Sequence, residues 1–164
     1  MPRGRGTRPT SDRVREGLFS ALGGDLSDRS FLDLYAGSGA VGLEAASRGA
    51  ARVVLVEREV SALNALRANV EALNLPHVEV RAESVARFLV EPAVPFDVVF
   101  LDPPYADPID TVLTALAANG WLSPKGMVVA ERATRDGEPP WPPGLVTDRS
   151  RRYADTTLWY GRRP

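Results

Sequence analysis

Residues 31–42 read FLDLYAGSGAVG, and this stretch decides the fold. Its first four residues form a short apolar run, interrupted by Asp33, that predicts a buried strand. Gly37-Ser38-Gly39 ends the run, and apolar residues at helical spacing follow from Val41. A strand, a glycine turn and a helix in this order open a nucleotide-binding βαβ unit. The glycines allow a close backbone approach to a ligand, and the helix N-terminus offers unpaired N–H groups.

Two ligands fit this loop on spacing alone. Gly37, Gly39 and Gly42 satisfy G-x-G-x-x-G, and Glu57 lies 20 residues beyond Gly37, where an acid can bind ribose hydroxyls of NAD. Asp33 argues against NAD, because a carboxylate beside the loop repels a pyrophosphate. S-adenosylmethionine has a ribose, a sulfonium and an ammonium but no phosphate, so Asp33 and Glu57 together favour it. The alternative for Asp33 is a strand-end residue that caps the glycine turn.

The remaining chain alternates between predicted strands and helices. An N-terminal helix is capped by Thr10 or Ser11 and ends at Gly23-Gly24. Apolar runs predict strands over residues 31–34, 51–57, 78–81, 96–101 and 127–131, with helices over 41–48, 61–74, 84–90 and 109–119. Residues 145–153 and 156–161 predict a terminal hairpin. We therefore expect a doubly wound α/β fold of the Rossmann-like type, with a mostly parallel seven-stranded sheet and a C-terminal antiparallel hairpin.

Composition limits the class of protein. The chain has 164 residues, 44% of them apolar and 25% charged, which suits one domain over residues 10–164 after a flexible arm over 1–9. The sequence has no cysteine, which excludes disulfides and a cysteine nucleophile, and His77 is the only histidine, so we expect no metal. Its apolar runs fall short of the ~20 residues of a membrane span. The basic, polar opening does not resemble a signal peptide, and we expect a cytoplasmic protein.

Positive charge gathers at the two ends of the sequence, although the net charge is −1. The first 16 residues have a local charge of +3 from Arg3, Arg5, Arg8, Arg13 and Arg15 against two acids. Residues 149–163 have +4 from Arg149, Arg151, Arg152, Arg162 and Arg163 against Asp155. Such ends can bind phosphates of a nucleic acid. Alternatively, arginine is simply the usual cation of this chain, because Lys125 is its only lysine.

A second motif, Asp102-Pro103-Pro104-Tyr105, directly follows the strand over residues 96–101. The prolines fix φ and stiffen the turn. The Asp102 carboxylate and the Pro103 carbonyl can accept both hydrogens of one NH2 group. Held in this way, the nitrogen lone pair of a base amine can point at a methyl sulfonium, while Tyr105 stacks on the base. The alternative is a proline-rich turn with a surface acid.

Together, the two motifs resemble those of S-adenosylmethionine-dependent amino-methyltransferases. More narrowly, residues 8–16 (RPTSDRVRE), 34–45 (LYAGSGAVGLEA) and 119–122 (NGWL) are similar to the RsmD family. Members of that family methylate N2 of a guanine in small-subunit ribosomal RNA. The resemblance extends from about Gly6 to Gly161. Family members usually begin with a further β-hairpin that carries an Arg-Ile-Ile-Gly-Gly-like stretch. This sequence instead starts at about the Arg-Pro-Thr segment, and this difference from the family pattern bears on RNA docking rather than on the cofactor site.

The resemblance implies roles for individual residues. The methionine and ribose parts of S-adenosylmethionine would contact Asp33, Tyr35, Ala36, Gly37, Ser38 and Gly39. Glu57 would bind the ribose hydroxyls, Arg58 would lie beside the adenine, and Glu83 or Ser84 would border the adenine. The target base would be held by Asp102, Pro103, Pro104 and Tyr105. Arg8, Thr10 and Arg13 would close the cofactor pocket or contact RNA. The positive charge of the N-terminal end adds Arg3 and Arg5 as expected RNA contacts. The implied partner is small-subunit ribosomal RNA or the assembling subunit, and we expect a monomer.

Two other classes remain as alternatives. DNA adenine-N6 methyltransferases also use Asp-Pro-Pro-Tyr, but they usually need a target-recognition domain, and this sequence has only short connections after residues 89 and 105. A nicotinamide-dependent oxidoreductase would leave residues 102–105 without a role.

Overall fold

The computed structural model describes residues 9–104 and 107–164. A seven-stranded sheet runs through them in the order β3-β2-β1-β4-β5-β7-β6. Its strands are β1 (Ser30–Leu34), β2 (Arg52–Glu57), β3 (Val78–Ala82), β4 (Phe96–Leu101), β5 (Leu122–Ala133), β6 (Val146–Tyr153) and β7 (Thr156–Arg162). Neighbours among β1–β5 pair in parallel, whereas β7 is antiparallel to both β5 and β6. The predicted doubly wound sheet with a C-terminal hairpin is confirmed.

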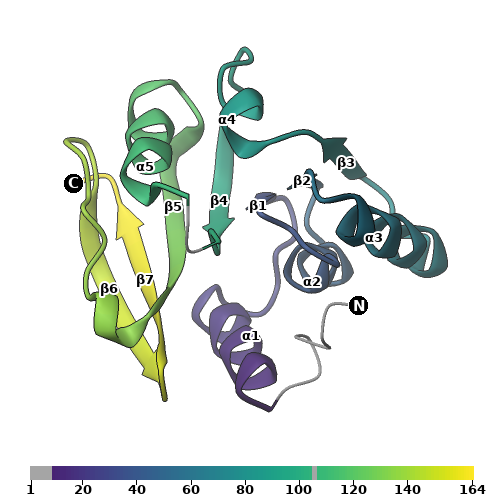
Figure 1. Ribbon diagram of the computed structural model, residues 1–164, viewed down its shortest axis with the longest axis horizontal. Coiled ribbons are helices and arrows are strands. Elements are labelled where there is room, and N and C mark those ends of the chain that lie inside the picture. The colour runs from purple at the N-terminus through teal and green to yellow at the C-terminus, as the bar shows by residue number, and fades with distance from the viewer. Residues whose placement is uncertain (1–8, 105–106) are drawn as a thin grey trace.

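Helices cover both faces of the sheet (Figure 1). They are α1 (Pro9–Ala21), α2 (Ala40–Ser47), α3 (Val60–Leu73), α4 (Val85–Phe88) and α5 (Ile109–Ala118), with a short 3-10 turn over Thr134–Asp136. Residues of α1, α2 and α3 belong to one buried cluster, and residues of α4 and α5 belong to a second. The sheet therefore separates two cores, as a doubly wound fold requires.

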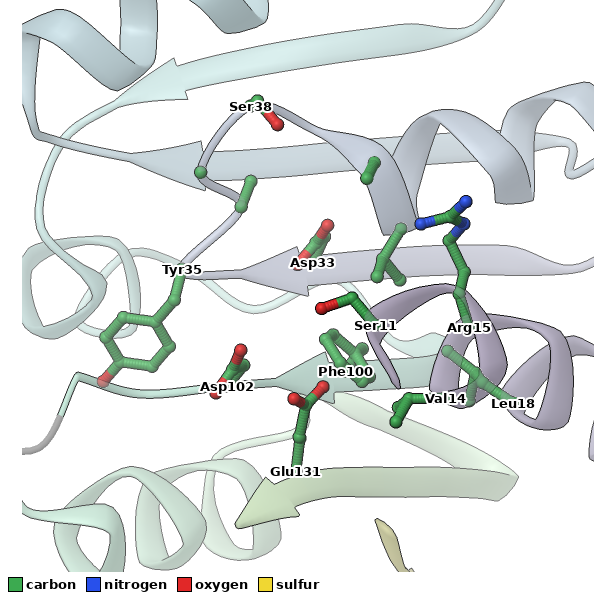
Figure 2. Close-up of a pocket in the computed structure, with 14 residues that line it drawn as sticks. Ser11, Val14, Arg15, Leu18, Asp33, Tyr35, Ser38, Phe100, Asp102 and Glu131 are labelled. Atoms are coloured by element: carbon green, nitrogen blue, oxygen red, sulfur yellow. The ribbon is translucent and has the colours of Figure 1, made fainter. Parts of the chain in front are cut away.

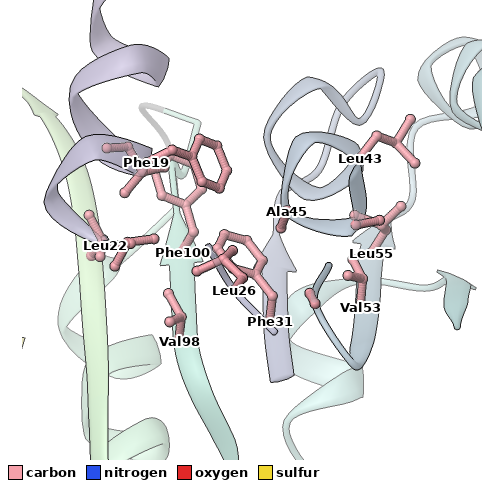
Figure 3. Close-up of a cluster of buried hydrophobic side chains, with 14 of the residues drawn as sticks. Phe19, Leu22, Leu26, Phe31, Leu43, Ala45, Val53, Leu55, Val98 and Phe100 are labelled. Carbon is pink, nitrogen blue, oxygen red and sulfur yellow. The ribbon is translucent and has the colours of Figure 1, made fainter. Parts of the chain in front are cut away.

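Side chains that alternate along the strands supply both cores. Phe31, Leu55 and Phe100 belong to the first cluster, and Leu32 and Val56 belong to the second. Because successive residues of a strand point to opposite faces, a strand buried on both faces must be apolar at nearly every position. Figure 3 shows the first cluster, in which Phe19 of α1 and Leu22, which directly follows α1, lie over strand residues such as Phe31 and Val98.

Most boundaries lie within one or two residues of the sequence-based expectation, and two differences have a clear physical reason. Helix α1 begins at Pro9, ahead of the predicted caps Thr10 and Ser11, because proline suits the first position of a helix. Strand β5 spans Leu122–Ala133 rather than 127–131. The ladder to β4 pairs Phe96 with Leu122 and then Val98 with Met127, so the intervening residues of β5 form an irregularity. Pro124 lies in that segment, where the irregular ladder tolerates a proline. Because proline interrupts the strand pattern in the sequence, the first part of β5 was not predicted.

The strand order places the predicted motifs side by side. Strand β1 pairs with β2 on one side and with β4 on the other, so the winding direction reverses between β1 and β4. Ligands of open α/β sheets bind at the carboxyl ends of strands at this point. The glycine loop follows β1 and Asp102 follows β4, so both lie at that edge. In the part of the chain that is described, no helix is long and apolar enough to cross a membrane.

Candidate active site

A cavity of about 150 Å³ lies at the carboxyl ends of β1, β4 and β5, under helix α1. Its lining includes five of the predicted cofactor residues, Asp33, Tyr35, Ala36, Gly37 and Ser38, together with Asp102 of the second motif. In Figure 2, Asp33, Asp102 and Glu131 point into the same space from neighbouring strand ends, and Ser11 reaches it from α1. The two motifs are thus brought together, as their positions in the sequence predict.

Asp33 is the buried polar group of this cavity, with 2% of its surface exposed. Its Oδ2 accepts a hydrogen bond from the Gly42 backbone N–H at 3.0 Å. Burial raises the pKa of Asp33 well above its ordinary value, the Gly42 bond partly opposes this, and the charges of Asp102, Glu57 and Glu131 raise it further. A cation in the cavity would reverse these effects, because it would favour the ionised carboxylate.

Carboxyl groups are the main charged groups in the described lining of the cavity. Three carboxylates line it, those of Asp33, Asp102 and Glu131. Among the described lining residues the only basic side chain is Arg15, whose guanidinium forms ion pairs with Glu44 at 2.9 Å and Asp12 at 3.3 Å. A lining of carboxyl groups favours a cationic ligand and disfavours a pyrophosphate, so it argues against NAD. Within residues 9–104 and 107–164 no group of His, Cys, Asp and Glu side chains is arranged to hold a metal ion.

The glycine loop is held by the acid at the end of β2. Gly37 has φ of 59°, in the left-handed region that favours glycine, and its N–H donates to Glu57 Oε1 at 2.7 Å. Glu57 Oε2 accepts from the backbone N–H groups of Arg58 at 3.1 Å and Glu59 at 3.0 Å. Glu57 does not line the cavity, but it fixes the loop that does.

The other two glycines of the motif serve packing. A Cβ on Gly39 would collide with the Leu66 side chain, and one on Gly42 would collide with that of Leu55. Helix α2 can therefore lie against β2 closely enough for the Gly42 N–H to reach Asp33. The predicted cofactor residue Gly39 is buried at the N-terminal end of α2, outside the cavity lining.

Tyr35 connects the glycine loop to the second motif. It has φ of 62°, an uncommon conformation for a tyrosine that is often found at functional sites. Burial raises its pKa above the ordinary value, as do the charge of Asp107 and the hydrogen bond to the Asp107 carboxylate. The Asp107 N–H in turn donates to the Pro104 carbonyl at 2.9 Å, which closes the loop after the prolines.

A second cavity of about 400 Å³ adjoins the first. Asp102 and Glu131 line both cavities, and Pro103 and Pro104 line the second. The far wall of the second cavity is formed by residues after β5 and by Asp155 and Thr156 at the turn of the terminal hairpin. Asp102 therefore stands at the boundary between two adjacent spaces.

Several predicted residues lie elsewhere or are not described. Ser84 caps α4, where its Oγ accepts from the Arg87 N–H at 3.1 Å, and Glu83 pairs with Arg81 at 2.7 Å. Arg58 is exposed after β2, and Arg13 faces the terminal hairpin instead of the cavity. The predicted residues Arg3, Arg5, Arg8 and Tyr105 lie outside the described residues, and so does the side chain of Thr10.

The structure also adds residues that the sequence patterns did not single out. Helix α1 covers the cavity with Ser11, Val14, Arg15 and Leu18, and β5 contributes Glu131. The sequence did contain a signal for Glu131 as a site residue. Glu131 ends an apolar run, as Glu57 does, and Asp102 likewise follows one. For α1, the family resemblance implied that Thr10 and Arg13 could close the pocket, but helical spacing alone does not say which face of a helix covers a cavity, and the described residues that do so are others.

Comparison with known proteins agrees with this geometry. The family model described as conserved hypothetical protein 95 matches residues 1–162. The ribosomal RNA small subunit methyltransferase D of Escherichia coli is 36% identical over 143 residues, which cover 87% of this chain and 72% of that protein. A conserved hypothetical protein of Streptococcus pyogenes has a TM-score of 0.85 at 31% identity, over 92% of this chain and 96% of that one.

A more distant structure shares the fold. It is the 16S ribosomal RNA guanine-N2 methyltransferase RsmC of Thermus thermophilus, in complex with S-adenosylmethionine and guanosine. The TM-score is 0.73 at 24% identity, over 100% of this chain and 45% of that one. The family match and the E. coli relative each cover most of the chain, and the chain therefore belongs to the RsmD family of ribosomal RNA small-subunit methyltransferases.

Proposed function

We propose that this protein transfers a methyl group from S-adenosylmethionine to the exocyclic N2 amine of a guanine in small-subunit ribosomal RNA. The observation that carries the proposal is the position of Asp102, which lines both the cavity beside the glycine loop and the cavity beside the proline turn. The first cavity is assigned to the methyl donor and the second to the target nucleotide.

The first cavity fits the amino-acid end of S-adenosylmethionine. Asp33 is buried and has a raised pKa, so it gains from a cation beside it, and the donor carries both a sulfonium and an ammonium. A volume of about 150 Å³ is below the ~300–1,000 Å³ of most small-molecule sites, so this cavity would hold one part of the donor. The ribose and adenine would extend over the ends of β2 and β3, where Glu57, Arg58, Glu83 and Ser84 are the expected contacts.

The second cavity fits a base that has left its stack. It is about 400 Å³ in volume, and Pro103 and Pro104 form one wall. The Asp102 carboxylate and the Pro103 carbonyl are the two acceptors offered to the hydrogens of the amine. Tyr105 remains the predicted stacking residue.

S-adenosylmethionine supplies a methyl group on a cationic sulfur and leaves as a neutral thioether. The chain's own residues orient the acceptor nitrogen. With both amine hydrogens held by Asp102 and Pro103, the nitrogen lone pair is withdrawn from the ring and can form the new N–C bond as the C–S bond breaks. The nitrogen becomes cationic and loses one proton, for which the Asp102 carboxylate is the acceptor that the turn provides. The carboxylate also stabilises the developing positive charge.

Two observations favour guanine N2 in ribosomal RNA over adenine N6 in DNA. The E. coli relative, at 36% identity, is named for small-subunit ribosomal RNA, and the RsmC neighbour is named for guanine N2. The chain also has short connections on both sides of β4, from Val90 to Pro95 before it and from Asp107 to α5 after it, which leave no room for a target-recognition domain there. We infer a cytoplasmic location and a monomer, because the proposed partner is the assembling ribosome and the proposed chemistry requires only one copy of the chain.

The experiment is transfer of tritiated methyl from S-adenosylmethionine to four substrates: undermethylated small subunits, the naked ribosomal RNA, DNA, and RNA from an already methylated strain. After digestion, labelled N2-methylguanosine from the first or second substrate supports the proposal. Labelled N6-methyladenine from DNA would instead establish the alternative class, and no label in any substrate would refute methyl transfer to these nucleic acids.

A further inference from the structure

We propose that a groove between helix α1 and the terminal hairpin binds phosphates of the RNA strand next to the target base, an inference that rests on the proposed function. The groove is called the basic groove here. It has a volume of about 660 Å³, and the residues that matter in its lining are Arg13, Glu16, Arg149, Arg151, Tyr153 and Tyr160.

The basic groove joins the two arginine-rich ends of the sequence. Arg13 comes from α1, whereas Arg149 and Arg151 come from β6 near the other end of the chain. Figure 1 shows α1 beside this hairpin, and the Arg149 Nη2 donates to the Ala21 carbonyl at the end of α1 at 2.9 Å. A charge pattern that is split in the sequence thus becomes one positive surface.

Strand geometry aims the hairpin residues at α1. Arg149, Arg151 and Tyr153 are two residues apart along β6, so their side chains leave the same face of the sheet. Arg149 pairs with Tyr160 of β7, and its guanidinium lies over the Tyr160 ring at 5.0 Å from the centroid. The Tyr160 side chain, which is 1% exposed, therefore fixes the direction of Arg149.

The floor of the groove depends on a glycine within α1. A Cβ on Gly17 would collide with the Tyr153 hydroxyl, so the helix carries glycine where the hairpin approaches. Glycine inside a helix costs about 1 kcal/mol relative to alanine. Burial raises the pKa of Tyr160 to about 12, and the Tyr153 charge raises it too, while Arg149 and Arg151 lower it. Tyr160 is therefore neutral near pH 7 and adds no negative charge to the groove.

The charges of the groove remain available to a ligand. The lining contains three arginines and one acid, Glu16, so its net charge is positive. Among the described residues, the guanidinium groups of Arg13 and Arg151 form no hydrogen bond or ion pair, and that of Arg149 uses one N–H for the Ala21 carbonyl. Guanidinium groups with free N–H donors on a positive surface suit phosphate oxygens.

The groove lies on a path from the target-base cavity. Asp155 and Thr156 line that cavity, and Tyr153, which pairs with Thr156 across the hairpin turn, lines the groove. Arg151 and Arg149 follow at two and four residues from Tyr153 along β6, about 7 and 13 Å at the usual strand rise. An RNA strand that places a base beside Asp102 can therefore lay its neighbouring phosphates in the basic groove.

The test measures RNA binding as a function of salt for Arg13→Gln/Arg151→Gln. The probe is undermethylated small-subunit ribosomal RNA, as naked RNA and in assembled subunits. Arg67→Gln/Arg87→Gln is the matched control, because it removes the same charge from two exposed arginines on α3 and α4. Loss of two phosphate contacts should reduce the slope of log K against log salt by about 1.4–1.8 in the groove variant. The control should keep the wild-type slope, and both variants should bind S-adenosylhomocysteine as the wild type does.

Equal slopes for the groove variant and its control would overturn the proposal. A loss seen with assembled subunits but not with naked RNA would also overturn it, since the partner would then be a ribosomal protein. The result is separable from the proposed function. If the wild type binds the RNA without transferring methyl groups, the proposed function fails, but the salt slopes still test whether the basic groove binds phosphates. If methyl transfer is normal and the slopes are unchanged, only the groove proposal is refuted.

Discussion

Replacing Asp33 by asparagine should move stability and ligand binding in opposite directions. The variant keeps an oxygen that can accept the Gly42 N–H, but it removes the negative charge. In the free protein that charge is buried and faces the charges of Asp102, Glu57 and Glu131, which is why the pKa of Asp33 is raised. We therefore expect Asp33→Asn to stabilise the ligand-free fold and to weaken binding of the cationic donor.

The sign of the pH dependence follows from the raised pKa. The folded state holds the Asp33 proton more tightly than the unfolded chain, in which the pKa of this carboxyl is near 3.8. Wild-type stability therefore falls as the pH rises from that value through the raised pKa, and the penalty is complete above it. Each tenfold increase in proton affinity on folding corresponds to about 1.4 kcal/mol, or about 3–6 °C in melting temperature for a chain of this size. The advantage of Asp33→Asn should vanish near pH 3.8 and be full well above the raised pKa.

Binding should show the opposite effect. Hydrogen bonds to charged groups contribute about 1.5–3 kcal/mol, so the variant should bind S-adenosylmethionine about 10- to 150-fold more weakly. Urea denaturation across this pH range and titration calorimetry with S-adenosylmethionine measure the two quantities. An Asp33→Asn protein that is less stable than the wild type at neutral pH, or that binds the donor equally well, would refute this interpretation of the cavity.

Two further substitutions test the glycine loop. Glu57→Ala should weaken S-adenosylhomocysteine binding by roughly 1–3 kcal/mol in calorimetry, since the predicted ribose acceptor and the anchor of Gly37 are both lost; unchanged affinity would refute the ribose assignment. Gly42→Ala should lower the free energy of unfolding by about 1–3 kcal/mol in urea, because its Cβ would meet Leu55 and push α2 away from Asp33. A Gly42→Ala protein of wild-type stability would show that α2 can shift without cost.

Local signals in the sequence were sufficient for the sheet and for the two motifs. A parallel strand buried on both faces must be apolar at nearly every position, so β1, β2 and β4 are visible as apolar runs, interrupted within the strands only by Asp33 and Asp97. Gly37 and Pro103 mark turns through their own backbone chemistry. The positions of the motifs at strand ends then follow from topology, because the ends of parallel strands meet at one edge.

The features that were missed depend on contacts between distant residues. The residues with which α1 covers the cavity, and the meeting of Arg13 with Arg151, both depend on how α1 packs on the sheet; the resemblance had implied only that Thr10 and Arg13 could close the pocket. Strand β5 was predicted too short because Pro124 interrupts its pattern while the ladder to β4 resumes beyond it. Glu57 was expected to face a ribose, and the structure adds that it accepts the Gly37 N–H, which only the fold brings within reach.

The most direct test of the account is methyl transfer in a single turnover by the wild type, Asp102→Ala and Asp102→Asn, with saturating S-adenosylmethionine and RNA. Asp102 is assigned an interaction that strengthens as the nitrogen becomes cationic, so its loss should appear in the rate more than in binding. By analogy with removal of one oxyanion-hole donor, Asp102→Ala should be about 10²–10³-fold slower. Asp102→Asn keeps a carbonyl acceptor and should retain more activity, and both variants should bind S-adenosylhomocysteine nearly as well as the wild type. Equal rates for all three proteins would remove Asp102 from the reaction and contradict methylation of an exocyclic amine at this site.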